Sequence, residues 1–188
     1  MKKVFLIVSV LLFAFTLSAQ EAGKIRGGLD VGFSLPKGGG GFCYDLNLAY
    51  NITDNMNAGI RYGSAIMAKT VGEESAELSA NACYLGTFNY YFNNGSSSFA
   101  PFVGAGMGYY ALGKISMSDD DTSVGGAGKF GGLITAGFEL SKLRFGVEYN
   151  LIPKTEVQAI LGGTTTKVSN SYLAITIGFY LGGGKWKK

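Results

Sequence analysis

Residues Lys129–Ile152 read KFGGLITAGFELSKLRFGVEYNLI, and this stretch decides the fold class. On both sides of Ser141–Lys142, apolar side chains recur at every second position, which is the period of a β-strand. A two-residue turn at Ser141–Lys142 would place Glu139 opposite Arg144. The apolar rows of the two strands then share one face, while the charges and glycines share the other. The stretch therefore predicts an antiparallel hairpin with one apolar and one small, polar face.

The same period-two pattern recurs along most of the chain. Glycine-rich or polar segments interrupt it at 36–41, 67–77, 113–128 and 153–170, where we expect loops. Loops after the second, fourth and sixth strands are short, and three of the others are long. The predicted fold is all-β: an eight-stranded antiparallel up-and-down barrel. Its expected strands are residues 24–35, 42–52, 56–66, 78–92, 99–112, 129–140, 143–152 and 171–181.

Two environments suit such a barrel. A soluble barrel points its apolar row inward, and a membrane barrel points it toward lipid. No lysine after residue 19 falls in the middle of an expected strand, although a water-facing sheet would carry several there. The other face is instead rich in glycine, asparagine, serine and threonine, which suits a narrow lumen. The pattern favours a transmembrane barrel, closed because an unpaired strand edge cannot remain in hydrocarbon.

The first residues have the pattern of an export signal. Lys2 and Lys3 precede an apolar run that ends near Thr16, and small residues follow at Ser18 and Ala19. We expect a cleavable signal peptide at 1–19 and a barrel domain at 20–188, with a retained signal anchor as the alternative. The barrel would then be exported. A GGGKWKK tail follows the last expected strand.

Three stretches carry a resemblance to a known family. They are PFVGAGMGYY at 101–110, AGFELSKLRFGVEYNLI at 136–152 and YLAITIGFYL at 172–181. The chain resembles the small eight-stranded outer-membrane barrels of the OmpA-type, OmpX-like and opacity-protein group. The resemblance implies a monomer in the cell outer membrane that meets outer-membrane lipid, lipopolysaccharide and the insertion machinery. Its N-terminus would lie in the periplasm and its long loops outside. A surface or envelope protein partner is also expected. Many such barrels end on a terminal aromatic residue, whereas this chain continues into its tail.

Composition argues against several classes of function. The chain has no histidine, and the members of the group that act as enzymes rely on one, so we expect no enzyme activity, cofactor or metal site. Without Lys2 and Lys3, 14 basic residues face 13 acidic ones, which gives no case for nucleic acid binding. The GAGMG glycines at 104–108 lie within an expected strand rather than before a helix, so close packing of a curved wall explains them better than a nucleotide loop.

The charged residues of the polar face form the candidate site. Acids and bases nearly balance there, and charges inside a narrow barrel must pair. One interpretation is a structural plug, in a barrel with a structural or surface-interaction (adhesion or partner-binding) role. The alternative is a passive channel for small solutes or hydrophobic molecules, because rings of charge tune selectivity in pores. Lys142, in the turn, is expected to be exposed. The predicted lumen network is Arg26, Asp30, Asp45, Arg61, Glu139, Arg144 and Glu148.

The two cysteines, Cys43 and Cys83, fall on expected strands that a third strand separates. Second-neighbour strands lie about 9–10 Å apart. That spacing exceeds the Cα separation that a disulfide spans, about 7 Å at most. We therefore expect two free, buried thiols, with a disulfide as the alternative.

Overall fold

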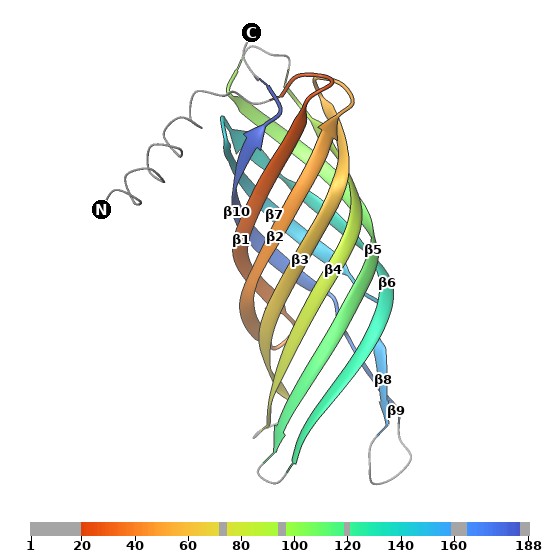
Figure 1. The fold of residues 1–188 in the computed structure, drawn as a ribbon. Coiled ribbons are helices and arrows are strands. Elements are labelled where there is room, and N and C mark those ends of the chain that lie inside the picture. Colours follow the sequence, from red (N-terminus) through yellow and green to blue (C-terminus); the bar gives the residue numbers. More distant parts are fainter. Residues whose placement is uncertain (1–19, 72–74, 94–96, 119–120, 159–164, 185–188) are drawn as a thin grey trace, which may run out of the picture.

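The computed structural model describes residues 20–71, 75–93, 97–118, 121–158 and 165–184. The expected signal peptide and the last four residues of the tail lie outside these ranges. Within the described residues, eight strands close into one barrel in which the first and last strands pair with each other (Figure 1). Every neighbouring pair is antiparallel. The all-β, up-and-down barrel is therefore confirmed.

The strands differ greatly in length. Those of the first and last parts of the chain are short, and those in the middle reach 20 residues. None of the described segments is a helix that is apolar and long enough to cross a membrane. The barrel strands are β1 (Ile25–Pro36), β2 (Gly39–Asn51), β3 (Met56–Val71), β4 (Ser75–Tyr91), β5 (Phe99–Ser118), β6 (Asp121–Leu140), β7 (Leu143–Leu151) and β10 (Tyr172–Gly182).

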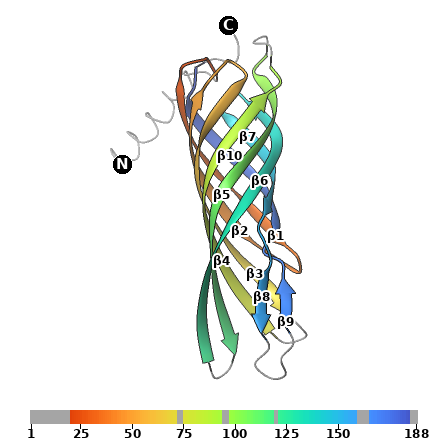
Figure 2. The same ribbon diagram turned by 90° about the vertical axis from the view of Figure 1, so that its right-hand side faces the viewer.

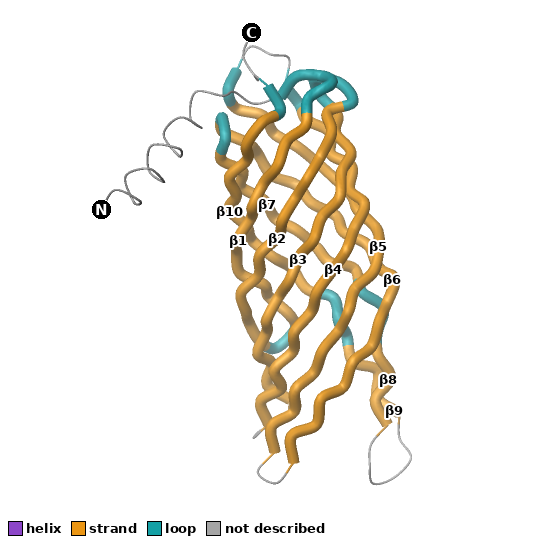
Figure 3. The backbone as a smooth tube through the Cα atoms, in the orientation of Figure 1, coloured by secondary structure: helices purple, strands orange, loops and turns teal. Residues whose placement is uncertain are grey.

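The hairpin that decides the fold forms as its sequence predicts. Leu140 pairs with Leu143, and Glu139 lies opposite Arg144 in the ladder between β6 and β7. Ser141 adopts a φ of 59°, the left-handed conformation that a two-residue hairpin turn requires. The start of β1, the end of β10 and the turns after β2 and β6 lie together at one end of the barrel (Figure 3). We call this the short-turn end and the opposite one the long-strand end.

Three predicted loops are wrong in detail. Residues 67–77 and 113–128 mostly continue the strands, because β3 pairs with β4 as far as Val71–Ser75 and β5 with β6 as far as Ser118–Asp121. The 36–41 segment reduces to a tight turn between Pro36 and Gly39. Strand pairing uses only backbone groups, so the ladders extend past the point where the apolar alternation fades. These extensions of β3–β6 project from the long-strand end.

The segment between β7 and β10 also contains strands. Here β8 (Thr155–Gln158) and β9 (Thr165–Val168) pair as a separate two-stranded sheet. Both views show this hairpin projecting from the long-strand end, apart from the closed wall (Figures 1 and 2). Pro153 lies just after β7 and lacks the N–H that continued pairing with β6 would need. The predicted loop at 153–170 is therefore partly strand.

The apolar rows face outward, as the membrane interpretation predicts. Ile175 is 52% exposed and Val147 49%, whereas their neighbours Thr176 and Glu148 are buried. Aromatic side chains form two bands on this outer surface. The band at the short-turn end contains Phe138, stacked on Phe145 with 5.0 Å between ring centroids. The band nearer the long-strand end contains Tyr44, Tyr62, Tyr84, Tyr109 and Phe130.

Candidate functional site

All seven charged residues of the predicted network are buried. Their exposed fractions run from 1% for Asp30 and Glu139 to 7% for Asp45. Each occupies a strand position whose neighbours along the chain face outward, so alternation alone points its side chain into the barrel. The structure brings all seven into the lumen, in two clusters and a linking segment.

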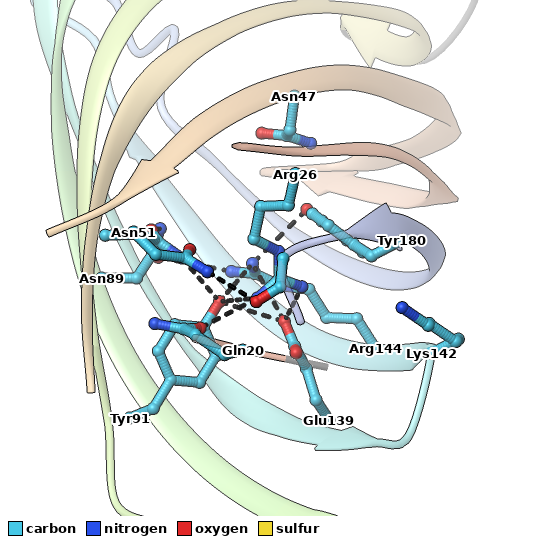
Figure 4. Close-up of polar contacts among 12 residues, drawn as sticks. Gln20, Arg26, Asn47, Asn51, Asn89, Tyr91, Glu139, Lys142, Arg144 and Tyr180 are labelled. Atoms are coloured by element: carbon cyan, nitrogen blue, oxygen red, sulfur yellow. Dashed lines mark hydrogen bonds and ion pairs between the residues drawn. The ribbon is translucent and has the colours of Figure 1, made fainter. Parts of the chain in front are cut away.

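The short-turn cluster consists of Arg26, Glu139, Arg144 and Tyr91. Arg26 Nη2 lies 2.8 Å from Glu139 Oε1, while Arg144 Nη1 lies 3.8 Å from the same oxygen. The Tyr91 hydroxyl donates to Glu139 Oε1 at 3.0 Å and accepts from Arg26 Nη1 at 3.2 Å. Sequence pairing indicated Arg144 as the partner of Glu139, but the closer partner comes from β1, across the lumen (Figure 4).

Aromatic rings hold both arginines of this cluster in place. The Arg144 guanidinium lies 3.8 Å from the centroid of the Phe102 ring, and that of Arg26 lies 4.4 Å from the centroid of Tyr180. Such contacts stabilise a desolvated guanidinium by about 2 kcal/mol. They also fill the space beside the planar groups with carbon instead of water. The flat faces of the two guanidinium groups therefore pack against aromatic rings, while their N–H edges face Glu139.

The mid-barrel cluster consists of Arg61, Glu148, Asp45 and Asn47. Arg61 makes a two-pronged ion pair with Glu148, at 2.7 and 3.0 Å. Its Nε donates to Asn47 Oδ1 at 2.9 Å, and Asp45 lies 3.9 Å from Nη1. The fork geometry makes this the strongest type of ion pair that side chains form. Arg61 is thus the counter-ion of both Glu148 and Asp45.

Asp30 and Tyr180 link the two clusters. Asp30 Oδ2 accepts from Asn47 Nδ2 at 2.7 Å and from the Tyr180 hydroxyl at 2.8 Å. The Tyr180 hydroxyl in turn accepts from Arg144 Nη1 at 3.4 Å. A continuous chain of polar contacts therefore runs from the short-turn cluster to the mid-barrel cluster.

Toward the long-strand end the lumen contains mostly apolar side chains, with Ser79, Asn81 and Asn150 as buried polar ones among them. A group of buried side chains fills it, and it includes both cysteines, which are free thiols as expected. The Tyr110 hydroxyl is satisfied by donating to Asn150 Oδ1 at 2.9 Å. The members are Cys43, Ala65, Met67, Cys83, Leu85, Tyr110, Leu112, Leu133, Ile152, Tyr172 and Ala174.

Glycines on the inner wall make room for the large polar side chains. In several cross-strand pairs one residue is glycine and the other is bulky, and a Cβ added to the glycine would overlap the side chain of its partner. Close packing of the curved wall thus explains Gly104, because the Asn89 side chain occupies the space that a Cβ at residue 104 would need. The pairs are Gly28 with Tyr180, Gly178 with Asp30, Gly63 with Asp45 and Gly104 with Asn89.

The expectation that Lys142 is exposed is wrong. Its side chain is 4% exposed, and Nζ donates to the carbonyl of Gly182 at 3.1 Å. Lys142 lies in the turn, outside the strands that would cross a membrane. Burial, with a contribution from Arg26, lowers the pKa of Lys142 to about 8, although Glu139 opposes the shift. The turn therefore directs this lysine toward the mouth of the barrel.

Sequence reasoning missed the uncharged members of the network. Tyr180 and Asn47 lie on the expected inner face, but the alternation gives their direction and not their partners. Tyr91 accepts from or donates to three charged groups, yet in the sequence it stands in an ordinary aromatic run. Gln20, 2% exposed, accepts from Arg26 Nη1 at 3.1 Å. Its position immediately after the expected signal peptide was a signal that could have singled it out.

Comparisons with known proteins agree on the fold. No protein-family model matches the sequence, and no curated protein matches it either. Among solved structures, the barrel is similar to Neisserial surface protein A (NspA), with a TM-score of 0.55 and 13% identity over 85% of this chain and 97% of that one. It is also similar to the outer membrane protein OprG from Pseudomonas aeruginosa, with a TM-score of 0.50 and 15% identity over 87% and 98%. The chain is therefore a barrel with the fold of the small eight-stranded outer-membrane β-barrel proteins.

Proposed function

We propose that this protein is a non-enzymatic outer-membrane protein whose lumen is closed by its own side chains. We further propose that it binds a partner through the end from which β3–β6 project. The closed lumen is supported mainly by the chain of polar contacts that runs from Arg26 through Tyr180 and Asp30 to Glu148. An eight-stranded barrel is barely wide enough for its inward side chains. Here those side chains also bind one another across the lumen.

The pairing of the charges argues for a plug over a channel. A selective pore presents charged groups to passing ions, and those groups must be accessible to water. In this lumen Glu148 is held by both prongs of Arg61, and Glu139 by Arg26 and Tyr91. The buried cluster beyond them is mostly apolar and carries no charged side chain to attract an ion. Passive transport would require both the paired charges and the buried cluster beyond them to rearrange.

Residence in the outer membrane is supported by the outer surface. Its apolar side chains and two aromatic bands match what a barrel presents to hydrocarbon and to the two interfaces. The two similar folds are, by their names, a surface protein and an outer membrane protein. In the orientation that the resemblance to outer-membrane barrels implies, the N-terminus lies in the periplasm, so the short-turn end faces the periplasm and the extensions of β3–β6 lie outside the cell.

The projecting extensions support a surface-interaction role. Pairing of β6 with β7 covers only Gly132–Leu140, so no described strand pairs with the outer edge of β6 over residues 121–131. A free edge can accept an extended segment of a partner through backbone hydrogen bonds. The glycines at 125, 126 and 128 would allow a close backbone approach. We place the partner-binding surface on this edge.

Two measurements test the proposal. The full chain, reconstituted in planar bilayers, should give no steady current, and Arg61→Ala combined with Glu148→Ala should open a leak. Steady, large single-channel currents from the unmodified protein would refute the plug and favour transport. For the surface role, a photo-crosslinking residue at Ser123 should give specific adducts on intact cells, and one at Asp54 in the opposite end should give none. Equal yields at both positions would contradict the assignment.

A further inference from the structure

Gln20 closes the short-turn end of the lumen. It is the first described residue, and its side chain is buried among the short-turn cluster (Figure 4). Its Oε1 accepts from Arg26 Nη1 at 3.1 Å. Its Nε2, although buried, has no hydrogen-bond partner among the described residues. Among the described residues, the amide oxygen of Gln20 therefore has a hydrogen-bond partner and its amide nitrogen has none.

The backbone after Gln20 is fixed to the barrel rim. Asn51 Nδ2 donates to the carbonyl oxygens of Glu21 and Gly183, at 3.0 and 2.9 Å. The amide of Glu21 donates to the same Gly183 carbonyl. The side chain of Glu21 lies beside Gly184. These contacts hold the start of the barrel domain across its mouth, so a chain that begins at Gln20 would have its α-nitrogen at the mouth.

Arg26, Arg144 and Lys142 are buried around this position, and Glu139 is the acid that contacts Arg26 and Arg144. Two further acids lie at the rim: Glu21, whose side chain is beside Gly184, and Asp54, which accepts from the amide of Ala22. If the export signal is removed after Ala19, Gln20 begins the mature chain with an α-ammonium group. An α-ammonium group buried beside this cluster would be costly, because a buried charge requires a counter-charge and Glu139 already pairs with Arg26 and Arg144.

We propose that Gln20 becomes the first residue of the mature chain and is cyclised to pyroglutamate. The step is an intramolecular aminolysis. The α-nitrogen attacks Cδ of its own side chain, the N–Cδ bond forms, and the Cδ–Nε2 bond breaks. The α-nitrogen gives up its proton to the departing nitrogen, which leaves as ammonia. No oxidant, reductant or second substrate takes part.

The product suits the site better than the free amine does. The lactam retains the Oε1 carbonyl that Arg26 binds and discards the Nε2 that has no partner. It also replaces an ammonium group with a neutral N–H, so the local charge does not rise. Cyclisation thus adds a neutral cap to a lumen end that already contains three cations.

Mass spectrometry of the mature protein tests the proposal. The full precursor is expressed, purified from outer membranes and digested, and its N-terminal peptide is sequenced. The expected peptide begins at Gln20, is lighter than the coded sequence by one ammonia and has no reactive α-amine. A Gln20→Ala variant provides the matched control, since it should begin with a free amine at its coded mass. A free α-amine on Gln20, or a mature chain that begins at another residue, would overturn the proposal.

A second measurement tests the role of the cap. Chain beginning at Gln20 is refolded before and after treatment with a glutaminyl cyclase, and urea unfolding of the two forms is compared. The cyclised form should unfold at a higher urea concentration. Identical midpoints would refute the charge argument, because they would mean that the α-ammonium is tolerated among Arg26, Arg144 and Lys142.

Discussion

Arg61 is the residue whose loss should damage the lumen most. It is 4% exposed and is the cation in contact with two carboxylates of the mid-barrel cluster. Arg61→Ala removes both prongs of the pair with Glu148 and the hydrogen bond to Asn47. Glu148 and Asp45 then remain buried without their cation. The damage comes mainly from these stranded acids and less from the lost contacts themselves.

The expected cost follows from that distinction. Removing one partner of a buried ion pair typically destabilises a protein by about 3–5 kcal/mol, because the remaining charge is desolvated and uncompensated. Arg61→Ala should fall in this range at neutral pH. Removing Glu148 as well takes away one stranded charge, so the double change should cost less than the sum of the single changes, by roughly 1–3 kcal/mol.

Urea unfolding of the refolded barrel in lipid vesicles, followed by the gel shift between folded and unfolded forms, measures these differences. Lys24→Ala is the matched control, since Lys24 is exposed and its loss should change stability by no more than about 0.5 kcal/mol. Arg61→Lys keeps the charge but not the fork, and should lie between the two. If Arg61→Ala were no worse than Lys24→Ala, or if the two single costs simply added, the lumen would contain water and the paired network would be wrong.

The other predictions concern the wall, the orientation and the mouth. Ile175→Arg or Val147→Arg should cost roughly 2–4 kcal/mol in the same titrations because both face lipid, whereas Ile175→Leu should be nearly neutral; equal costs would mean that the faces are inverted. Cysteine at Ser123 should react with an impermeant thiol reagent on intact cells and cysteine at Asp54 should not, with the unsubstituted protein as background. The unfolded chain binds the Lys142 proton more tightly than the folded one does, so wild type should gain up to roughly 2–3 kcal/mol over Lys142→Met between pH 7 and 10. A difference between the two proteins that stays constant with pH would show that Lys142 keeps its ordinary pKa.

The features that the sequence predicts well are local. Leu140 and Leu143 flank the turn, and once they pair, the period of two determines every other contact of the hairpin, including Glu139 with Arg144. The same alternation assigns each charged residue to the inner face. These predictions succeed because they depend on a few neighbouring residues and on the geometry of a strand.

Strand length and lumen partners are harder to predict. Between Gly113 and Gly128 the apolar alternation is lost, yet β5 and β6 remain paired, since backbone hydrogen bonds do not depend on side-chain type. The pairing of Arg26 with Glu139 depends on the shear of the closed barrel, which brings β1 and β6 to the same height. Shear is a property of the whole wall, and no single hairpin encodes it.

The glycines and the charges of the inner wall are complementary parts of one packing arrangement. Asp30 can turn toward Tyr180 and Asn47 because its cross-strand neighbour is Gly178, and Tyr180 can lie over the lumen because its neighbour is Gly28. A water-filled channel would gain nothing from such matching, since solvent fills any gap beside a small residue. Matching matters only where side chains touch, so the pairs that appear in the sequence as scattered glycines support the closed lumen that we propose. In the plug that we propose, opening the lumen would require a change in strand register or the loss of an ion pair, because the space beside these glycines is already occupied by their cross-strand partners.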